Sequence, residues 1–219
     1  MLRAVTVVLR APSVSSVVKR SPAIALAIAP RLTFPVPKPA RPTMESLFAR
    51  ATRVDVISYP LPSGDVIQVR RLCVHFGRAT PGYLKSGTLL PTYTNKALVS
   101  FQGDAMFGEL ALLRWLEVDG WQGVWVDTGH GRKLWREMPT RATPVTLPPA
   151  QQTLHDQIVA ANGGRAGGFF DVMAWRGSHT IFVEYKGADE RAPKNEAAWI
   201  AAALRAGVSK NDLLLVRNE

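Results

Sequence analysis

The sequence predicts a mixed α/β protein whose N-terminal part is rich in strands. Three observations lead to this prediction. Residues 54–76 read as two strands, because a Pro-Ser-Gly-Asp turn separates two runs rich in β-branched residues. From residue 104 the apolar spacing becomes helical. Residues 167–187 hold two short apolar runs that meet at Gly177-Ser178, as expected of a β-hairpin.

Residues 1–43 differ in composition from the rest of the chain. They hold seven basic and no acidic residues and end in a proline-rich run with no pattern for packing. We interpret them as a disordered arm before a natural start at Met44; an organelle transit segment and a secretory signal are the alternatives. Their apolar run, residues 23–29, is too short for a membrane span, which takes about 20 residues.

The remaining composition favours a folded protein of a reducing compartment. Apolar residues make up 47% of the 219 residues, enough for a sizeable core. The single cysteine, Cys73, excludes an internal disulfide and a CxxC metal site. We expect a cytoplasmic location, or an organelle if residues 1–43 are a transit segment. The net charge of +10 says little about a partner, because residues 1–43 contribute +7 of it.

We divide the remaining chain into a β-rich region, residues 44–102, and a main domain, residues 103–219. The first region is either a small subdomain or an N-terminal extension of the main sheet. The further elements expected are a strand at 96–101, a helix from an Asp104 N-cap to Gly120, a strand at 121–128, a basic loop at 132–149 and a helix at 150–164.

Glu109 lies on the apolar stripe of the helix expected after Asp104. It precedes Leu112 by three residues and Leu116 by seven, so the three side chains share one face. An unpaired carboxylate is costly to bury. Glu109 is therefore either a hydrated residue of the first turn, where the helix dipole favours an acid, or a metal ligand that points inward.

The hairpin turn at Gly177-Ser178 fixes which residues face each other. If Arg176 faces His179, then Asp171 faces Glu184, with Cβ atoms about 4.5–5.5 Å apart. Lys186 lies two residues beyond Glu184 and shares its face. The other face carries an apolar set, Val172, Ala174, Ile181, Val183 and Tyr185.

Two facing carboxylates repel each other unless a cation lies between them. Oxygen ligands at this separation suit a hard divalent ion, Mg²⁺ or Mn²⁺. Two alternatives remain open. The face could be solvated, with Lys186 neutralising one acid, or the register could slip by one residue and separate Asp171 from Glu184.

The order Asp171, Glu184-Tyr185-Lys186 resembles the D…ExK core of the PD-(D/E)XK nuclease superfamily. The sequence that follows is similar to the VRR-NUC branch, over residues 103–219, at Gly187, Arg191, Trp199, Ala206, Gly207, Val216 and Arg217. Two positions depart from the branch. Phe170 stands where a proline usually precedes the aspartate, and Glu196 stands where the helix carries a glutamine, which could weaken substrate binding or add a metal contact.

The resemblance implies a restriction-endonuclease-like mixed sheet flanked by helices and a metal-dependent nuclease. Asp171, Glu184 and the Tyr185 carbonyl would hold one or two Mg²⁺ or Mn²⁺ ions, and Lys186 would orient the attacking water or stabilise charge on the phosphate. The superfamily's acid on the first core helix corresponds to Glu109, with Glu117 as the alternative.

The expected partner is nucleic acid, DNA rather than RNA, and a homo-oligomer stays open. Five basic residues are candidates for backbone phosphate contacts: Arg165, Arg191, Lys194, Arg132 and Lys133. The alternative function is a catalytically degenerate nucleic-acid-binding module of the same fold, which Glu196 and Phe170 favour.

Overall fold

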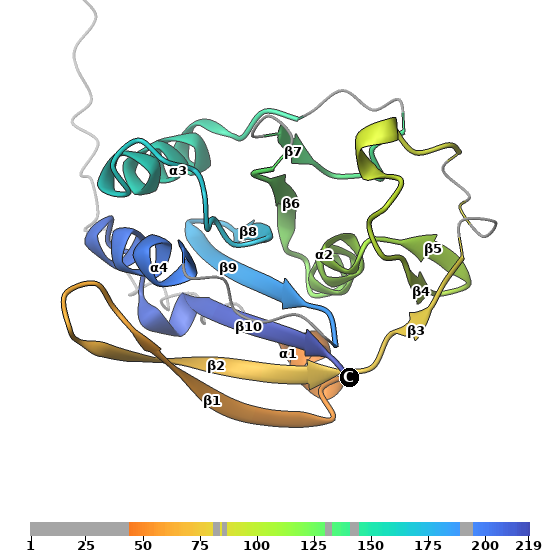
Figure 1. Ribbon diagram of the computed structural model, residues 1–219, viewed down its shortest axis with the longest axis horizontal. Coiled ribbons are helices and arrows are strands. Elements are labelled where there is room, and N and C mark those ends of the chain that lie inside the picture. The colour runs from red at the N-terminus through yellow and green to blue at the C-terminus, as the bar shows by residue number, and fades with distance from the viewer. Residues whose placement is uncertain (1–43, 81–83, 85–86, 130–132, 141–144, 189–194) are drawn as a thin grey trace, which may run out of the picture. The chain divides into compact units, whose positions relative to one another are not determined.

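A seven-stranded mixed sheet forms the centre of the protein (Figure 1). The computed structural model describes residues 44–80, 84, 87–129, 133–140, 145–188 and 195–219, so the arm expected at residues 1–43 lies outside the described residues. The strand order is β1-β2-β10-β9-β8-β6-β7, and a second, antiparallel sheet has the order β3-β4-β5. The α/β prediction is confirmed.

The strands are β1 (Arg53–Pro60), β2 (Val66–Val74), β3 (Gly77–Arg78), β4 (Val99–Phe101), β5 (Asp104–Met106), β6 (Gln122–Asp127), β7 (Lys133–Trp135), β8 (Val172–Arg176), β9 (His179–Lys186) and β10 (Leu213–Asn218). The α-helices of the described residues are α1 (Glu45–Ala49), α2 (Gly108–Val118), α3 (Pro149–Ala161) and α4 (Asn195–Arg205), with short 3-10 turns η2 (Pro91–Tyr93) and η3 (Lys210–Asp212). Within these ranges no helix combines the length and the apolar character that a membrane span requires.

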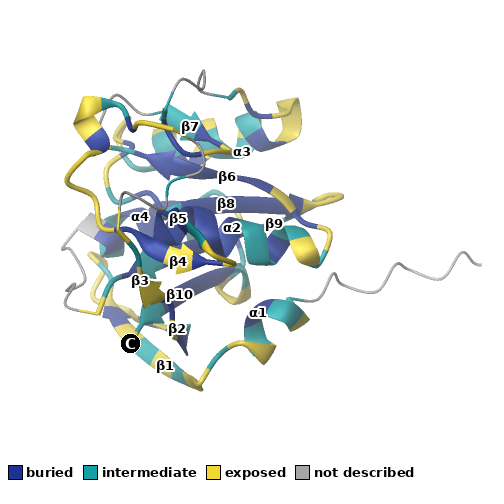
Figure 2. Ribbon diagram, turned by 90° about the vertical axis from the view of Figure 1, so that its right-hand side faces the viewer, coloured by how far each residue is buried: buried dark blue, intermediate teal, exposed yellow. Residues whose placement is uncertain are grey.

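Two apolar cores lie on opposite faces of the main sheet. One core joins α2 and the small sheet to the alternate residues Val172, Ala174, Ile181 and Val183 of the hairpin. The other joins α3 and α4 to the intervening residues, Met173 and Phe182 among them. Figure 2 shows the central strands buried between these layers, whereas β1 is partly exposed at the sheet edge. The hairpin is therefore buried on both faces.

Residues 44–102 contribute strands to both sheets. The hairpin β1–β2 turns at residues 61–65, and β2 pairs in parallel with β10, the last strand of the chain. Strands β4 and β5 pair across the boundary expected at residue 102, with Val99 opposite Met106. Strands β1 and β2 therefore extend the main sheet, whereas β3 and β4 belong to the second sheet. The described residues belong to one compact unit.

The register of the β8–β9 hairpin is the one expected from its turn. Arg176 pairs with His179, Trp175 with Thr180, and the pairing continues to Val172 with Val183. Gly177 has φ 60°, the conformation required at the first position of a type II′ turn. A slip by one residue is thereby excluded.

Two local predictions were wrong. Helix α2 begins at Gly108 and its N-cap is Phe107, because Asp104 belongs to β5, which returns from β4 through a tight turn at Gln102 and Gly103. The helix starts where its backbone meets β9: a Cβ atom on Gly108 would lie 2.2 Å from the Tyr185 ring. The loop expected at residues 132–149 contains β7, which pairs with β6.

Candidate functional site

Asp171 and Glu184 meet where β8 begins. The Asp171 backbone N–H donates to Glu184 Oε2 at 3.2 Å, and the Tyr185 N–H donates to Asp171 Oδ2 at 2.9 Å. The next strand holds Asp171 from its other side, because the Val126 N–H donates to the Asp171 carbonyl at 2.7 Å. The neighbouring backbone thus fixes both carboxylates in close proximity.

On the α4 side of the sheet, Glu184 belongs to a buried ionic cluster. Lys186 Nζ lies 2.6 Å from Glu184 Oε1 and also forms an ion pair with Glu196, in the first turn of α4. The Tyr59 hydroxyl, from β1, donates to Glu196 Oε2 at 3.0 Å. We refer to Tyr59, Glu184, Lys186 and Glu196 as the lysine cluster.

The burial of this cluster excludes a solvated charged face. Glu184 is 6% exposed and Lys186 is 7% exposed, because α4 and its large apolar residues, among them Trp199 and Ile200, cover this face. Two buried carboxylates and one ammonium are costly to keep out of water. Lys186 does neutralise Glu184, as the alternative interpretation required, but it does so inside the protein.

On the α2 side, Glu109 approaches Asp171. Glu109 lies in the first turn of α2 and is 5% exposed, so it is both a first-turn acid and an inward-pointing one. Its Oε1 lies 2.6 Å from Lys96 Nζ, whereas its Oε2 is buried and makes no hydrogen bond. The alternative acid, Glu117, is paired with Arg114 and Arg136. The charge of Glu109, and not that of Glu117, acts on the Asp171 carboxyl, so Glu109 is the helix acid beside Asp171.

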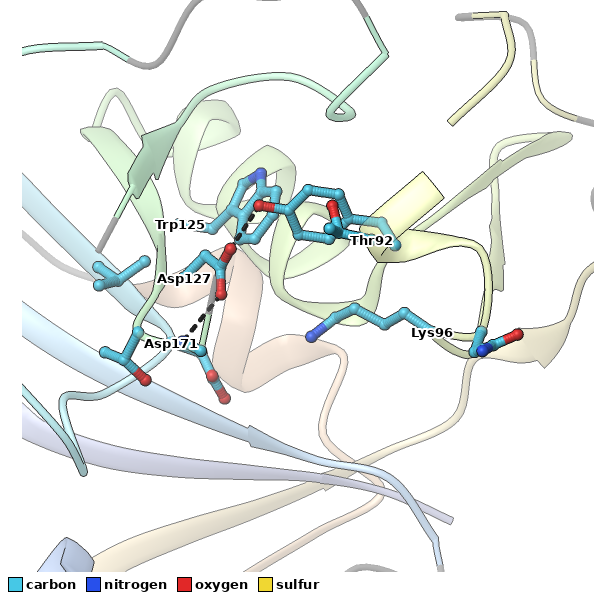
Figure 3. A pocket seen from close by; sticks show the side chains of 10 residues that line it. Thr92, Lys96, Trp125, Asp127 and Asp171 are labelled. Carbon is cyan, nitrogen blue, oxygen red and sulfur yellow. Dashed lines mark hydrogen bonds between the residues drawn. The ribbon is translucent and has the colours of Figure 1, made fainter. Parts of the chain in front are cut away.

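An open pocket of about 530 Å³ lies next to Asp171 (Figure 3). Asp127, at the end of β6, lines the pocket and accepts hydrogen bonds from the Tyr93 hydroxyl and, at 3.0 Å, from the Gly129 N–H. Lys96 lies at the rim, and its ammonium end points toward Asp171 in Figure 3. The pocket therefore offers solvent and ligands a route to Asp171.

The carboxylates hold their protons more tightly than usual. Burial and then the charge of Glu109 raise the pKa of Asp171 to about 8. Burial and then the charge of Asp171 raise the pKa of Glu184 well above its usual value. Burial alone would lower the pKa of Lys186, but Glu184 and Glu196 outweigh it and keep the ammonium charged. Bound positive charge would therefore stabilise the ionised acids.

The donor atoms fit a hard divalent cation. Asp171 and Glu184 supply carboxylate oxygens, and the unpartnered Oε2 of Glu109 is a further oxygen near Asp171. The described part of the chain holds no group of three acidic, histidine or cysteine side chains close enough to bind one ion. The expected convergence of Asp171, Glu184 and Glu109 is thus incomplete, because Glu184 lies on the α4 face and Glu109 comes from the α2 face, with Asp171 between them.

Two of the five basic residues expected to contact nucleic acid lie within the described residues. Lys133 begins β7 directly opposite Asp127, next to the pocket. Arg165 is exposed in the turn after α3. The other three, Arg132, Arg191 and Lys194, lie outside the described residues.

Three residues of the site were missed by the sequence analysis: Tyr59, Lys96 and Asp127. Asp127 could have been noticed, because it is the polar residue that ends an apolar strand next to the strand of Asp171. Tyr59 and Lys96 carry no such signal. Both residues precede the main domain expected at residues 103–219, and they reach the site through β2–β10 pairing and the η2–β4 connection.

No protein-family model matches the chain, and no curated protein or solved structure is similar to it.

Proposed function

We propose that the protein is a Mg²⁺- or Mn²⁺-dependent nuclease that hydrolyses phosphodiester bonds in DNA. One observation carries the proposal. Asp171 and Glu184 are in contact at the start of a buried hairpin, with the Lys186 ammonium 2.6 Å from Glu184 and an open pocket beside Asp171. The resemblance of residues 103–219 to VRR-NUC nucleases supports it from the sequence.

Asp171 and Glu184 would hold the cation, with the Tyr185 carbonyl as a further oxygen donor; Glu109 lies on the α2 side of Asp171 and would act on the ion through its charge. A divalent cation bound there supplies an activated water and polarises the phosphate. Lys186 contributes a fixed positive charge, because the carboxylates of Glu184 and Glu196 hold its ammonium in place, 2.6 Å from Glu184 Oε1. Such a charge stabilises the negative charge that develops on the phosphate oxygens. Lys96, at the pocket rim, is positioned to contact a neighbouring phosphate.

The test is cleavage of single-stranded, duplex and branched DNA by the full chain in Mn²⁺, compared with Asp171→Asn. This substitution keeps the size of the side chain and removes a metal ligand, so we expect activity to fall by a factor of about 100 or more. Asp55→Asn is the matched control, because Asp55 pairs with Arg71 on β1 and β2 outside the site. Equal cleavage by wild type and Asp171→Asn would contradict the proposal.

A nucleic-acid-binding module without catalysis is the second candidate. The ion pair between Lys186 and Glu196 favours it, since a second carboxylate engages the ammonium that would otherwise face the phosphate. This candidate predicts DNA binding in a fluorescence anisotropy titration that is equal in Mn²⁺ and EDTA, with no cleavage product on a gel. Cleavage that requires Mn²⁺ would exclude it.

A further inference from the structure

The lysine cluster connects three distant segments of the chain. Tyr59 comes from the edge strand β1, Glu196 from α4, and Glu184 and Lys186 from β9. The contacts run in series: the Tyr59 hydroxyl donates to Glu196, Glu196 pairs with Lys186, and Lys186 pairs with Glu184. All four residues are buried, with exposed fractions between 1% for Glu196 and 7% for Lys186.

This series restricts the ammonium of Lys186 more than a single ion pair could. Lysine has a flexible four-carbon stem, and one carboxylate leaves the ammonium free to rotate about it. Here carboxylates from two different elements hold it from two directions. Glu196 is itself held by the Tyr59 hydroxyl and lies in the first turn of α4, where the helix dipole favours a negative charge.

The Tyr59 hydroxyl is suited to remain a donor. Burial and then the charge of Glu196 raise its pKa above the ordinary value, so the hydroxyl keeps its proton at neutral pH. Without the Tyr59 hydroxyl, one carboxylate oxygen of Glu196 would be buried among apolar side chains with no hydrogen-bond donor, which would lower stability. The hydroxyl thus stabilises an acid at a position where the resembling nucleases carry a neutral amide.

We propose that Tyr59 and Glu196 are positioning residues that fix the Lys186 ammonium for phosphodiester cleavage. This inference rests on the proposed nuclease function. It makes β1, which lies before the segment resembling VRR-NUC, part of the active site. Neither residue touches the substrate; both act through Lys186.

The first arm of the test is independent of activity. Reductive methylation of the metal-free protein, followed by mass spectrometry, measures how accessible the Lys186 amine is. Tyr59→Phe and Glu196→Gln should each raise the methylation rate of Lys186 roughly tenfold, because the ammonium is freed more often. Ile57→Val is the control, since Ile57 lies on the same face of β1, packs against the same core and has no polar side-chain group that could bond to Glu196.

The second arm separates positioning from a structural role. With Mn²⁺ and DNA, Tyr59→Phe should lower kcat about tenfold and leave KM within about twofold, because a misplaced charge affects the transition state more than binding. Ile57→Val should change neither constant. Equal methylation and equal kcat in Tyr59→Phe and Ile57→Val would overturn the inference.

The two proposals can fail separately. A wild type that does not cleave DNA would remove the nuclease function and the catalytic part of this inference, while methylation would still decide whether Tyr59 and Glu196 hold Lys186. A wild type that cleaves, with kcat unaffected by Tyr59→Phe and Glu196→Gln, would leave the nuclease function and overturn the positioning role.

Discussion

Two lysines lie on either side of Asp171 and differ in almost every respect. Lys186 is buried on β9 and is shared between Glu184 and Glu196. The side chain of Lys96 is 39% exposed and pairs with Glu109, with its ammonium 5.5 Å from the centre of the Phe107 ring. If the Lys186 ammonium moved away, two buried acids would lose their cation, whereas the Lys96 ammonium can move into the pocket. The first suits a fixed electrostatic role and the second an exchangeable one.

The largest expected effect is the loss of stability when the buried ion pairs of Lys186 are removed. Lys186→Met leaves Glu184 and Glu196 buried without their cation and should lower the free energy of unfolding by about 3–5 kcal/mol. Lys96→Met should cost less, about 1–3 kcal/mol, because a single buried acid, Glu109, loses its cation and the Lys96 side chain is itself 39% exposed. Urea denaturation of the two metal-free variants measures both values. Equal losses would mean that the two lysines do not differ in this way.

The second prediction concerns metal binding at Asp171. Mn²⁺ at a hundredfold excess over Kd should stabilise the wild type by about 2.7 kcal/mol, since the ion binds the folded state alone. Asp171→Asn should abolish this shift and, above about pH 8, where Asp171 is ionised, also raise the melting temperature of the metal-free protein, because repulsion from Glu109 is relieved. Thermal melts in EDTA and in Mn²⁺ measure both effects. A wild type that melts at one temperature in both buffers would contradict a metal site.

The third prediction is a loss of metal-free stability with rising pH. The Asp171 carboxyl has a pKa of about 8 in the folded protein and its ordinary value of 3.8 in the unfolded chain. The folded state therefore binds more protons between these values, and its stability should fall as the pH rises through this window. Asp171→Asn should flatten the profile. A wild-type stability that increases from pH 5 to pH 8 would show that the acid is not destabilised by burial.

The smallest expected effect is a change in metal affinity when Lys96 is replaced. Its ammonium and a divalent cation are attracted by the same acids, Glu109 and Asp171, so Lys96→Met should tighten Mn²⁺ binding roughly fivefold, which corresponds to about 1 kcal/mol between two hydrated charges. Titration of free Mn²⁺ by electron paramagnetic resonance measures the affinity. Weaker binding in Lys96→Met would instead indicate that the Lys96–Glu109 pair organises the site.

The hairpin carrying Asp171 and Glu184 was predictable because its information is local. A glycine in the turn and side chains that alternate along two strands fix the register of every pair, and the structure has that register. The start of α2 was not predictable in the same way. Asp104 is a good N-cap, but it pairs with Phe101 in β5, and the helix begins instead at Gly108, where the backbone lies against the Tyr185 ring.

The α/β class, the β8–β9 hairpin and the contact of two acids across it could be inferred from the sequence, since each follows from neighbours along the chain, whereas strands β5 and β7 and the start of α2 could not. The tertiary structure alone decided how the charges of the site are balanced. Tyr59, Lys96 and Glu196 reach it from β1, from the segment between η2 and β4, and from α4, and each is far from Asp171 in sequence. The periodicity of a sequence indicates which face of an element a residue lies on. Whether a charge on that face is buried depends on what packs against it. Here the covering elements are set by the pairing of β2 with β10 and by the packing of α4 over β9.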